Sequence, residues 1–158
     1  MHTNFRKFLF GLLAAPVSVL LLTLSIDSAH AQAAPGAKEG LLAGCTNANN
    51  CVSSNALDEK SRIAPFKVAL PPEQAWTGLQ RVIEATPDAK IVQVTPDYLQ
   101  VEFTTKLLFT DDVEFLLRRG QEEIAVRSAS RTGYYDFGAN RKRIEALRVQ
   151  LREKGIIE

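Results

Sequence analysis

Histidine is almost absent from this sequence. The 158 residues contain two histidines, His2 and His30, and both lie near the N-terminus. The rest of the chain therefore lacks the side chain that most often acts as a general base, which excludes a Ser-His-Asp arrangement there. The glycine-containing signatures of serine hydrolases, phosphate-binding loops and dinucleotide-binding loops are missing as well. We expect no cofactor and, without a catalytic motif, favour a protein that is not an enzyme over one that is.

A large net charge is also lacking. The sequence contains 19 basic and 18 acidic residues, which gives a formal net charge of +1. Proteins that bind nucleic acid or anionic membranes through their overall charge are strongly basic. We therefore expect no nucleic-acid partner, and the partner predicted by the sequence is a small molecule or a protein of the cell envelope.

The first 31 residues have the pattern of a secretory signal peptide. Arg6 and Lys7 precede an apolar run over residues 8–24, and the small-x-small triplet 29–31 follows. The apolar run is slightly short for a bilayer span and contains a proline. We predict cleavage after Ala31 and a periplasmic or secreted location. The alternative is an uncleaved signal that anchors the protein in the membrane.

The letters LLAGC at residues 41–45 match a lipobox, after which bacterial lipoproteins are cut and lipidated on the cysteine. A lipobox adjoins its apolar segment, whereas a polar stretch lies between the two here. Placing Lys38 and Glu39 in the bilayer would cost about 2–3 kcal/mol each. A lipidated Cys45 is therefore only a minor alternative, and we expect membrane contact solely through an uncleaved signal.

Cysteine is scarce, and its two copies are close together. Cys45 and Cys51 are six positions apart, and an even number of cysteines in an exported chain favours a disulfide. So short a loop would contribute about 2 kcal/mol on the chain-entropy model. Two thiolates without histidine do not complete a metal site, and the spacing differs from the Cys-x-x-Cys of thiol oxidoreductases. We predict a structural disulfide and no metal.

The remaining sequence predicts a flexible linker and one α+β domain. Residues 32–44 are small and polar with several glycines, which indicates a linker, and residues 45–158 form the domain with an N-terminal disulfide loop. Apolar periodicity predicts, in order, a strand, a helix, four strands and a helix, over residues 66–70, 71–85, 89–94, 98–109, 111–117, 122–131 and 139–154. An antiparallel meander with both helices on one face is the expected two-layer sandwich.

The densest group of charges falls on the last hairpin. With its turn at Arg119-Gly120, Asp112 lies opposite Arg127 and Glu114 is diagonal to it. The expected polar face holds Glu102, Asp112, Glu114, Arg127 and Arg131. One interpretation is a ladder of ion pairs on a solvated face, worth a few tenths of a kcal/mol per pair, at about the level of exposed salt bridges. The other is an arginine-lined site for a carboxylate, a phosphate or an acidic partner. We favour the ladder.

The connection to the last helix offers a second candidate site. Asp136 or Asn140 could cap the helix and Gly138 could form a tight turn. Alternatively, the first amides together with Arg141 and Arg143 could hold an anion. Capping is the interpretation that we favour. The candidate ligand-binding residues are Arg127, Arg131, Tyr134, Asp136, Asn140 and Arg141. No catalytic residue is assigned.

Several motifs resemble domain of unknown function family 1499. They are NCVSS, P-x-x-x-W, DYLQVEFTT, DDVEFLL and VRSASRTGYYDFGANRKRIEALR, and the similarity runs from about residue 41 to residue 153. The cysteines of that family commonly enclose a proline-containing loop, whereas CTNANNC keeps both cysteines and Asn50 without the prolines. The resemblance implies an exported or membrane-associated domain of bacteria and plastids. It implies no activity, cofactor or catalytic residue.

Three functions fit these observations. The first is a non-enzymatic periplasmic binding or accessory module that holds a small or anionic ligand, or a protein partner, near Arg127, Arg131 and residues 134–143. The second is a hydrolase or isomerase that uses carboxylate and tyrosine chemistry, for which the available residues are Asp112, Glu114, Tyr134 and Asp136. The third is an envelope scaffold without a ligand.

Overall fold

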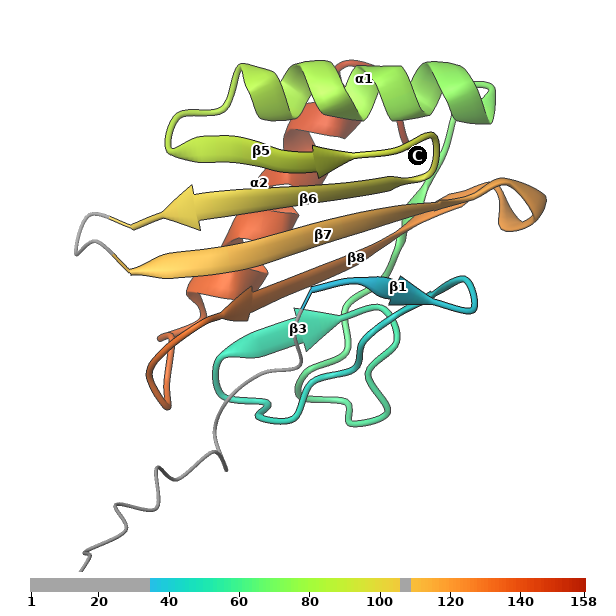
Figure 1. Cartoon of the computed structure of the whole chain (residues 1–158). Coiled ribbons are helices and arrows are strands. Elements are labelled where there is room, and N and C mark those ends of the chain that lie inside the picture. Colours follow the sequence, from blue (N-terminus) through green and yellow to red (C-terminus); the bar gives the residue numbers. More distant parts are fainter. Residues whose placement is uncertain (1–34, 106–108) are drawn as a thin grey trace, which may run out of the picture.

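A six-stranded antiparallel sheet forms the centre of the structure (Figure 1). The computed structural model describes residues 35–105 and 109–158, so the predicted signal peptide lies outside the described residues. The sheet order is β3-β8-β7-β6-β5, and β4 also pairs with β8. The strands are β3 (Cys51–Ser53), β4 (Phe66–Lys67), β5 (Ala89–Val94), β6 (Tyr98–Thr104), β7 (Thr110–Arg118) and β8 (Glu123–Ser130).

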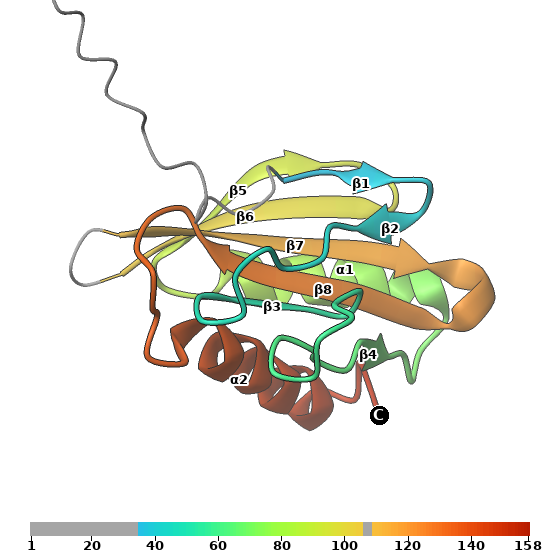
Figure 2. The same cartoon turned by 90° about the horizontal axis from the view of Figure 1, so that it is seen from below.

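Both helices lie on the same face of this sheet, as the sequence predicts (Figure 2). Helix α1 (Pro72–Glu84) begins with a proline at its first position, where the missing amide costs no hydrogen bond. It ends just before Thr86, because a residue that precedes proline avoids the helical conformation. Helix α2 (Ala139–Glu153) follows Gly138, whose φ of 78° favours glycine.

The main core lies between the helices and the sheet. The apolar side chains at helical spacing in α1 and α2 are buried against the inward-facing residues of β6, β7 and β8. The fully buried members include Leu79, Ile83, Val101, Val113, Phe115, Ile124, Val126, Ile144 and Leu151. Trp76 is 5 % exposed and belongs to this core, where an aromatic residue in an apolar helix stripe is expected. The predicted α+β class, the four-stranded meander and the position of the helices are confirmed.

The opposite face of the sheet is covered by a small hairpin of β1 (Ala37–Lys38) and β2 (Leu41–Leu42), which lies over β7 and β8 (Figure 2). Leu42 is buried with Tyr98, Leu116 and Ala125 in a second, smaller core. A flexible linker is expected over residues 32–44; within it β1 pairs with β2, Leu42 is buried and residues 37–41 are exposed. The hairpin was not expected because one leucine provides the apolar contact, and two-residue strands are too short to show periodicity.

The pairing of β7 with β8 differs from the predicted register. Glu114 lies directly opposite Arg127, where the sequence analysis placed Asp112. The hairpin loop is longer than the two residues assumed, because it contains a 3₁₀ turn (Arg119–Gln121) followed by Glu122 in the left-handed conformation, with φ of 51°. Moving the centre of the loop by one residue moves every cross-strand pair by two positions on the same face. The same side chains therefore share the face, but with different partners.

The two adjacent leucines of β2 test whether the hairpin contributes to stability. Leu42 is 3 % exposed and Leu41 is 51 % exposed. We expect Leu42→Ala to lower the free energy of unfolding by about 2–3 kcal/mol, because it empties a buried site, whereas Leu41→Ala should change it by less than about 0.5 kcal/mol. Urea unfolding followed by circular dichroism measures both. Equal effects of the two substitutions would contradict the docked hairpin.

Candidate functional site

Arg127 and Glu114 form an ion pair that is completely buried beneath the hairpin. Neither side chain has any solvent exposure, and Arg127 Nη1 donates to Glu114 Oε2 at 2.5 Å. The other carboxylate oxygen, Oε1, accepts hydrogen bonds from the Tyr98 hydroxyl at 3.0 Å and from the Gly36 amide at 2.6 Å. A buried carboxylate needs such donors because its desolvation is costly. The Arg127 guanidinium therefore lies inside the protein and does not face a solvent cleft.

Arg131 lies further along the same face and is also paired. Its Nε and Nη2 donate to the two oxygens of Asp112, each at 2.8 Å, and Nη2 also contacts Glu102 Oε1 at 2.5 Å. The hydrogen bonds that Arg131 donates, first to Asp112 and then to Glu102, raise the pKa of Arg131 above its usual range. The two-fold contact with Asp112 uses the fork geometry with which arginine would otherwise bind an anion. This end of the sheet face is a cross-strand ladder.

Asp136 caps helix α2. Its Oδ1 accepts from the Gly138 amide at 2.8 Å, and its Oδ2 accepts from the Asn140 amide at 3.0 Å. These are two of the backbone amides that lack an acceptor at a helix start. The capping interpretation of the sequence describes this carboxylate correctly.

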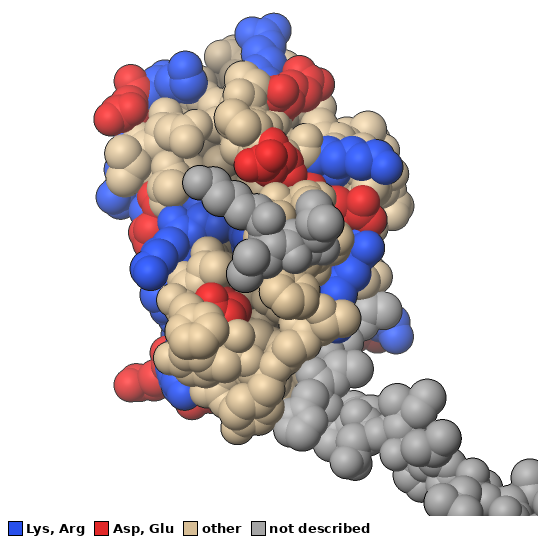
Figure 3. Space-filling model, turned by 90° about the vertical axis from the view of Figure 1, so that its left-hand side faces the viewer, with Lys and Arg blue, Asp and Glu red and all other residues tan. Residues whose placement is uncertain are grey.

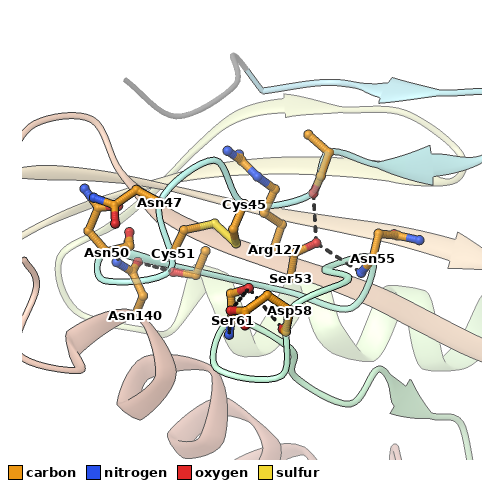
Figure 4. Close-up of a disulfide and its surroundings, with 12 residues drawn as sticks. Cys45, Asn47, Asn50, Cys51, Ser53, Asn55, Asp58, Ser61, Arg127 and Asn140 are labelled. Carbon is orange, nitrogen blue, oxygen red and sulfur yellow. Dashed lines mark hydrogen bonds between the residues drawn. A yellow bond between two sulfur atoms is a disulfide. The ribbon is translucent and has the colours of Figure 1, made fainter. Parts of the chain in front are cut away.

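Asn140 joins α2 to the sheet from a fully buried position. Its Nδ2 donates to the Asn50 carbonyl and to Ser130 Oγ, each at 3.0 Å, and its Oδ1 accepts from Ser128 Oγ at 2.6 Å. Figure 4 shows Asn140 and Asn50 close to each other, to the left of the disulfide. Arg141, one residue further, donates through Nη2 to the carbonyls of Lys60 and Arg62, each at 2.9 Å. Both side chains connect α2 to distant segments.

The predicted disulfide between Cys45 and Cys51 is present, with the Cα atoms 5.7 Å apart (Figure 4). The loop that it closes supports the connection to α2, because Asn47 Nδ2 donates to the Tyr134 carbonyl at 3.0 Å and Asn50 Nδ2 donates to the Gly133 carbonyl at 2.5 Å. A sulfur engaged in a disulfide cannot also carry a lipid thioether. The disulfide fits an extracytoplasmic, oxidising compartment.

Two arginines of the last motif have structural roles that the sequence analysis missed. Arg143 Nη2 contacts Asp111 Oδ2 at 2.5 Å, and its guanidinium lies 4.9 Å from the centre of the Phe103 ring. Arg148 donates to the carbonyls of Ala64 and Pro65 at 2.6 and 3.0 Å. Both arginines flank the apolar stripe of α2, and that position is the signal that could have identified them, since long side chains at the margin of a buried stripe often reach across it.

The exposed feature of this region is aromatic. We call the rings of Phe109, Tyr134, Tyr135 and Phe137 the aromatic end; these residues are 52, 59, 54 and 80 % exposed. The rings of Tyr135 and Phe137 are perpendicular, with their centres 5.0 Å apart. In Figure 3, which faces this end of the molecule, the area below the grey atoms is largely tan, with one acidic group inside it and basic side chains at its margins. Clustered exposed rings of this kind are typical of binding surfaces.

Two clefts border the connection between β8 and α2. The aromatic cleft, of about 340 Å³, is lined by Phe109, Asp111, Ser130, Tyr135, Asp136 and Phe137, among others. The basic cleft, of about 460 Å³, lies towards the disulfide loop and includes Lys60, Tyr135, Asp136, Arg141 and Lys142. A larger groove of about 800 Å³ lies along α1 and the C-terminal residues, away from all the candidate residues. Pockets for small ligands commonly have volumes of about 300–1,000 Å³.

The candidate residues are thus divided between two places. Arg127 and Arg131 lie on the hairpin side of the sheet, whereas Asp136, Asn140 and Arg141 surround the start of α2 on the helix side. Within residues 35–105 and 109–158, no group of three or more His, Cys, Asp or Glu side chains could hold a metal ion. In the same described ranges, no helix is long and apolar enough to cross a bilayer.

The fold and the site define a class of small α+β domain with a disulfide-closed loop, a hairpin over one sheet face and exposed rings at one end. A family described as "protein of unknown function (DUF1499)" matches residues 41–151, and the chain belongs to this family. Neither the curated proteins nor the solved structures contain a match to the chain.

Removal of one partner from the buried ion pair tests its structural role. We expect Arg127→Met to lower the free energy of unfolding by about 3–5 kcal/mol, because it leaves the Glu114 carboxylate buried without its counter-charge. The matched Arg131→Met should cost less, about 1–2 kcal/mol, because the Arg131 side chain is 42 % exposed and only its Asp112 partner is buried. Urea unfolding provides the comparison, and the double variant Arg127→Met/Glu114→Leu should recover part of the loss. A similar cost for both single variants would refute the assignment.

Tyr98 should make stability depend on alkaline pH. Burial, and secondarily the Glu114 carboxylate, raise the pKa of this phenol above its ordinary value. In the unfolded chain a tyrosine loses its proton at about pH 10 while the folded protein keeps it, so stability should fall above about pH 10. Tyr98→Phe has no phenol at this position, so its stability lacks this dependence on alkaline pH. Loss of the hydrogen bond to Glu114 should lower its free energy of unfolding by about 1–3 kcal/mol at neutral pH, as expected for a bond to a charged group. The difference between the urea midpoints of the two proteins should therefore narrow as the pH rises. A constant difference would contradict this explanation.

Proposed function

We propose that the protein is a non-enzymatic binding module of the cell envelope, periplasmic or secreted, and that it binds through the aromatic end. The observation that carries the proposal is the exposure of Tyr135 and Phe137, 54 and 80 %, beside a cleft. Apart from Phe109 and Tyr134, the other aromatic side chains of the described residues are buried, namely Phe66, Trp76, Tyr98, Phe103 and Phe115. Exposed apolar rings clustered beside a cleft favour association with a ligand or partner. The disulfide supports the extracytoplasmic location.

The loop that carries these rings is held in place by the rest of the domain. The Asp136 amide donates to the Asn49 carbonyl at 3.1 Å, and the side chains of Asn47 and Asn50 donate to carbonyls of the loop. The Asp136 carboxylate fixes the other end of the loop to α2. A binding surface that is ordered before the ligand arrives avoids part of the entropic cost of association. This supports a binding role for the loop.

A site for an anion has weaker support. The guanidinium groups of Arg127, Arg131 and Arg141 already have acceptors in the protein. In the basic cleft, Lys60 donates to Asn49 Oδ1 at 2.6 Å. An incoming anion would have to compete with these partners. A neutral or cationic small molecule, or a protein partner, is therefore favoured over the anionic ligand that the arginine-rich motif suggests.

The alternative of a hydrolase or isomerase requires its four residues to act together. Asp112 and Glu114 lie under the hairpin and are bound to arginines, whereas Tyr134 and Asp136 belong to the connection on the helix side. A general acid and base must reach the same substrate. The separation of these residues gives the enzyme alternative less support than the binding module. The third alternative, a scaffold without a ligand, does not explain why aromatic rings are exposed beside a cleft.

A thermal-shift screen tests the proposal. The purified protein is screened with envelope metabolites, lipids and cell-wall fragments, and each compound that raises the melting temperature is mapped by backbone amide shifts in NMR. We expect the shifts to cluster on residues 132–138. Phe137→Ala should weaken binding by about tenfold, as for a well-placed aromatic contact.

Val149→Ala is the matched control, because Val149 is 53 % exposed and lies on α2 outside the residues of both clefts. It should bind with unchanged affinity. Ligands that bind Phe137→Ala and the unmodified protein equally, or that map to the groove along α1, would refute the proposed surface. A screen without any ligand would favour the scaffold.

A further inference from the structure

The aromatic cleft is lined by both aromatic rings and carboxylates. Three of the residues around it, Phe109, Tyr135 and Phe137, provide aromatic rings, and two others, Asp111 and Asp136, provide carboxylates. Among the described residues that line it, none is a lysine or an arginine. Aromatic rings present a negative face, and carboxylates carry a full negative charge, so both types of group favour a cation.

The two carboxylates at the cleft differ in how far their charge is compensated, and Lys142 Nζ donates to the Phe137 carbonyl at 3.5 Å. Asp111, only 2 % exposed, is neutralised from behind by Arg143 at 2.5 Å. Asp136 is partly exposed, and no Lys or Arg contact with its carboxylate is among the ion pairs of the described residues. The helix start contributes roughly half a positive charge. The Gly138 and Asn140 amides that carry this partial charge point at the Asp136 carboxylate, which outweighs them.

The two adjacent rings have the geometry that surrounds an ammonium group. Tyr135 and Phe137 stand at 90° to each other with centres 5.0 Å apart. A guest in the corner between them touches the faces of both rings, and Phe109 approaches from the loop between β6 and β7. Ring faces within about 6 Å of a cation contribute about 0.5–1 kcal/mol each at exposed sites. Rings from two separate loops, with a carboxylate beside them, match this type of recognition.

We propose that the aromatic cleft binds an organic cation, an ammonium group carried by a small molecule or by a lysine side chain. The inference rests on the proposed function and specifies the ligand class for the same surface. The ammonium would contact the faces of Tyr135 and Phe137 and lie near the Asp136 carboxylate. A volume of about 340 Å³ accommodates a headgroup of this kind and lies at the lower end of ligand pockets.

Three small probes distinguish the effect of ligand charge from that of ligand shape. They also distinguish the two kinds of ligand that could carry the ammonium group. Choline provides a quaternary ammonium, N-acetyl-lysine methylamide provides a lysine side chain, and 3,3-dimethyl-1-butanol is the uncharged isostere of choline. Saturation-transfer NMR and amide-shift titration of the full chain give the affinities. We expect one of the two ammonium probes to bind with a dissociation constant of about 1–10 mM and the uncharged isostere to bind at least about fivefold more weakly, as loss of a cation–π contact implies.

Substitutions locate the site. Phe137→Ala should weaken binding of the ammonium probe by about two- to fivefold, if each ring contributes at the level of exposed cation–π contacts. The double variant Tyr135→Ala/Phe137→Ala should weaken it by about tenfold. Val149→Ala and Leu57→Ala, at residues 53 and 93 % exposed elsewhere on the surface, should leave the affinity unchanged. None of these four side chains belongs to a core cluster, so all variants should fold.

The outcomes distinguish this inference from the proposed function. Equal binding of choline and its uncharged isostere, binding of neither ammonium probe, or a preference of the same residues for a neutral sugar or an anion would overturn the cation site. In each of these cases, a screened ligand that still maps to residues 132–138 would leave the proposed binding surface intact. Ammonium probes that shift only residues of the groove along α1 would overturn both.

Discussion

The buried pair of Arg127 and Glu114 is the interaction on which the arrangement of this domain depends. Two charges in the middle of a sheet are tolerable only if they meet each other and if further donors satisfy the carboxylate. Tyr98 and the Gly36 amide supply those donors, and the second comes from the segment that leads into the hairpin. The hairpin segment therefore shields the ion pair from solvent and also provides one of the hydrogen-bond donors that replace water at the carboxylate. The chain consequently has two interfaces on its sheet, an apolar one under the helices and a mixed one under the hairpin.

Sequence periodicity predicted the elements that are long enough to show it. Helices α1 and α2 and strands β5 to β8 follow apolar patterns, and they were expected at nearly the observed positions. Of the strands of two or three residues, β4 lies within the strand expected over residues 66–70, whereas β1, β2 and β3 were not predicted. These three are too short for periodicity, and contacts are made by single side chains such as Leu42. The register of β7 and β8 was displaced because a loop that begins with a 3₁₀ turn has no distinct signature in the sequence RRGQ. Local patterns specify elements, whereas loops decide which residues meet.

The candidate site could be predicted only in part for the same reason. A carboxylate before a helix start is a known capping signal, and Asp136 fulfils it. From the sequence alone, the five arginines of residues 126–148 could equally belong to an anion-binding site. In the structure their partners are backbone carbonyls, carboxylates and rings supplied by distant segments. Conversely, Tyr135 and Phe137 lie in a stretch without periodicity, so nothing in the sequence distinguishes them from core aromatics. Their exposure emerges only when the disulfide loop and α2 fix the connection between them.

The two edges of the sheet are closed in different ways, and both affect whether a strand of another chain can pair with the sheet. Strand β8 is paired along part of its length with β3 and along another part with β4, so two short segments share the task of closing one edge. Strand β5 is the other edge, and a β-bulge between Ile91 and Gln93 interrupts its regular pairing with β6. Irregular and short edge strands are poor templates for a strand from another chain. The domain can therefore present apolar rings at its end in a crowded compartment without offering a continuous backbone ladder along which copies of itself could polymerise.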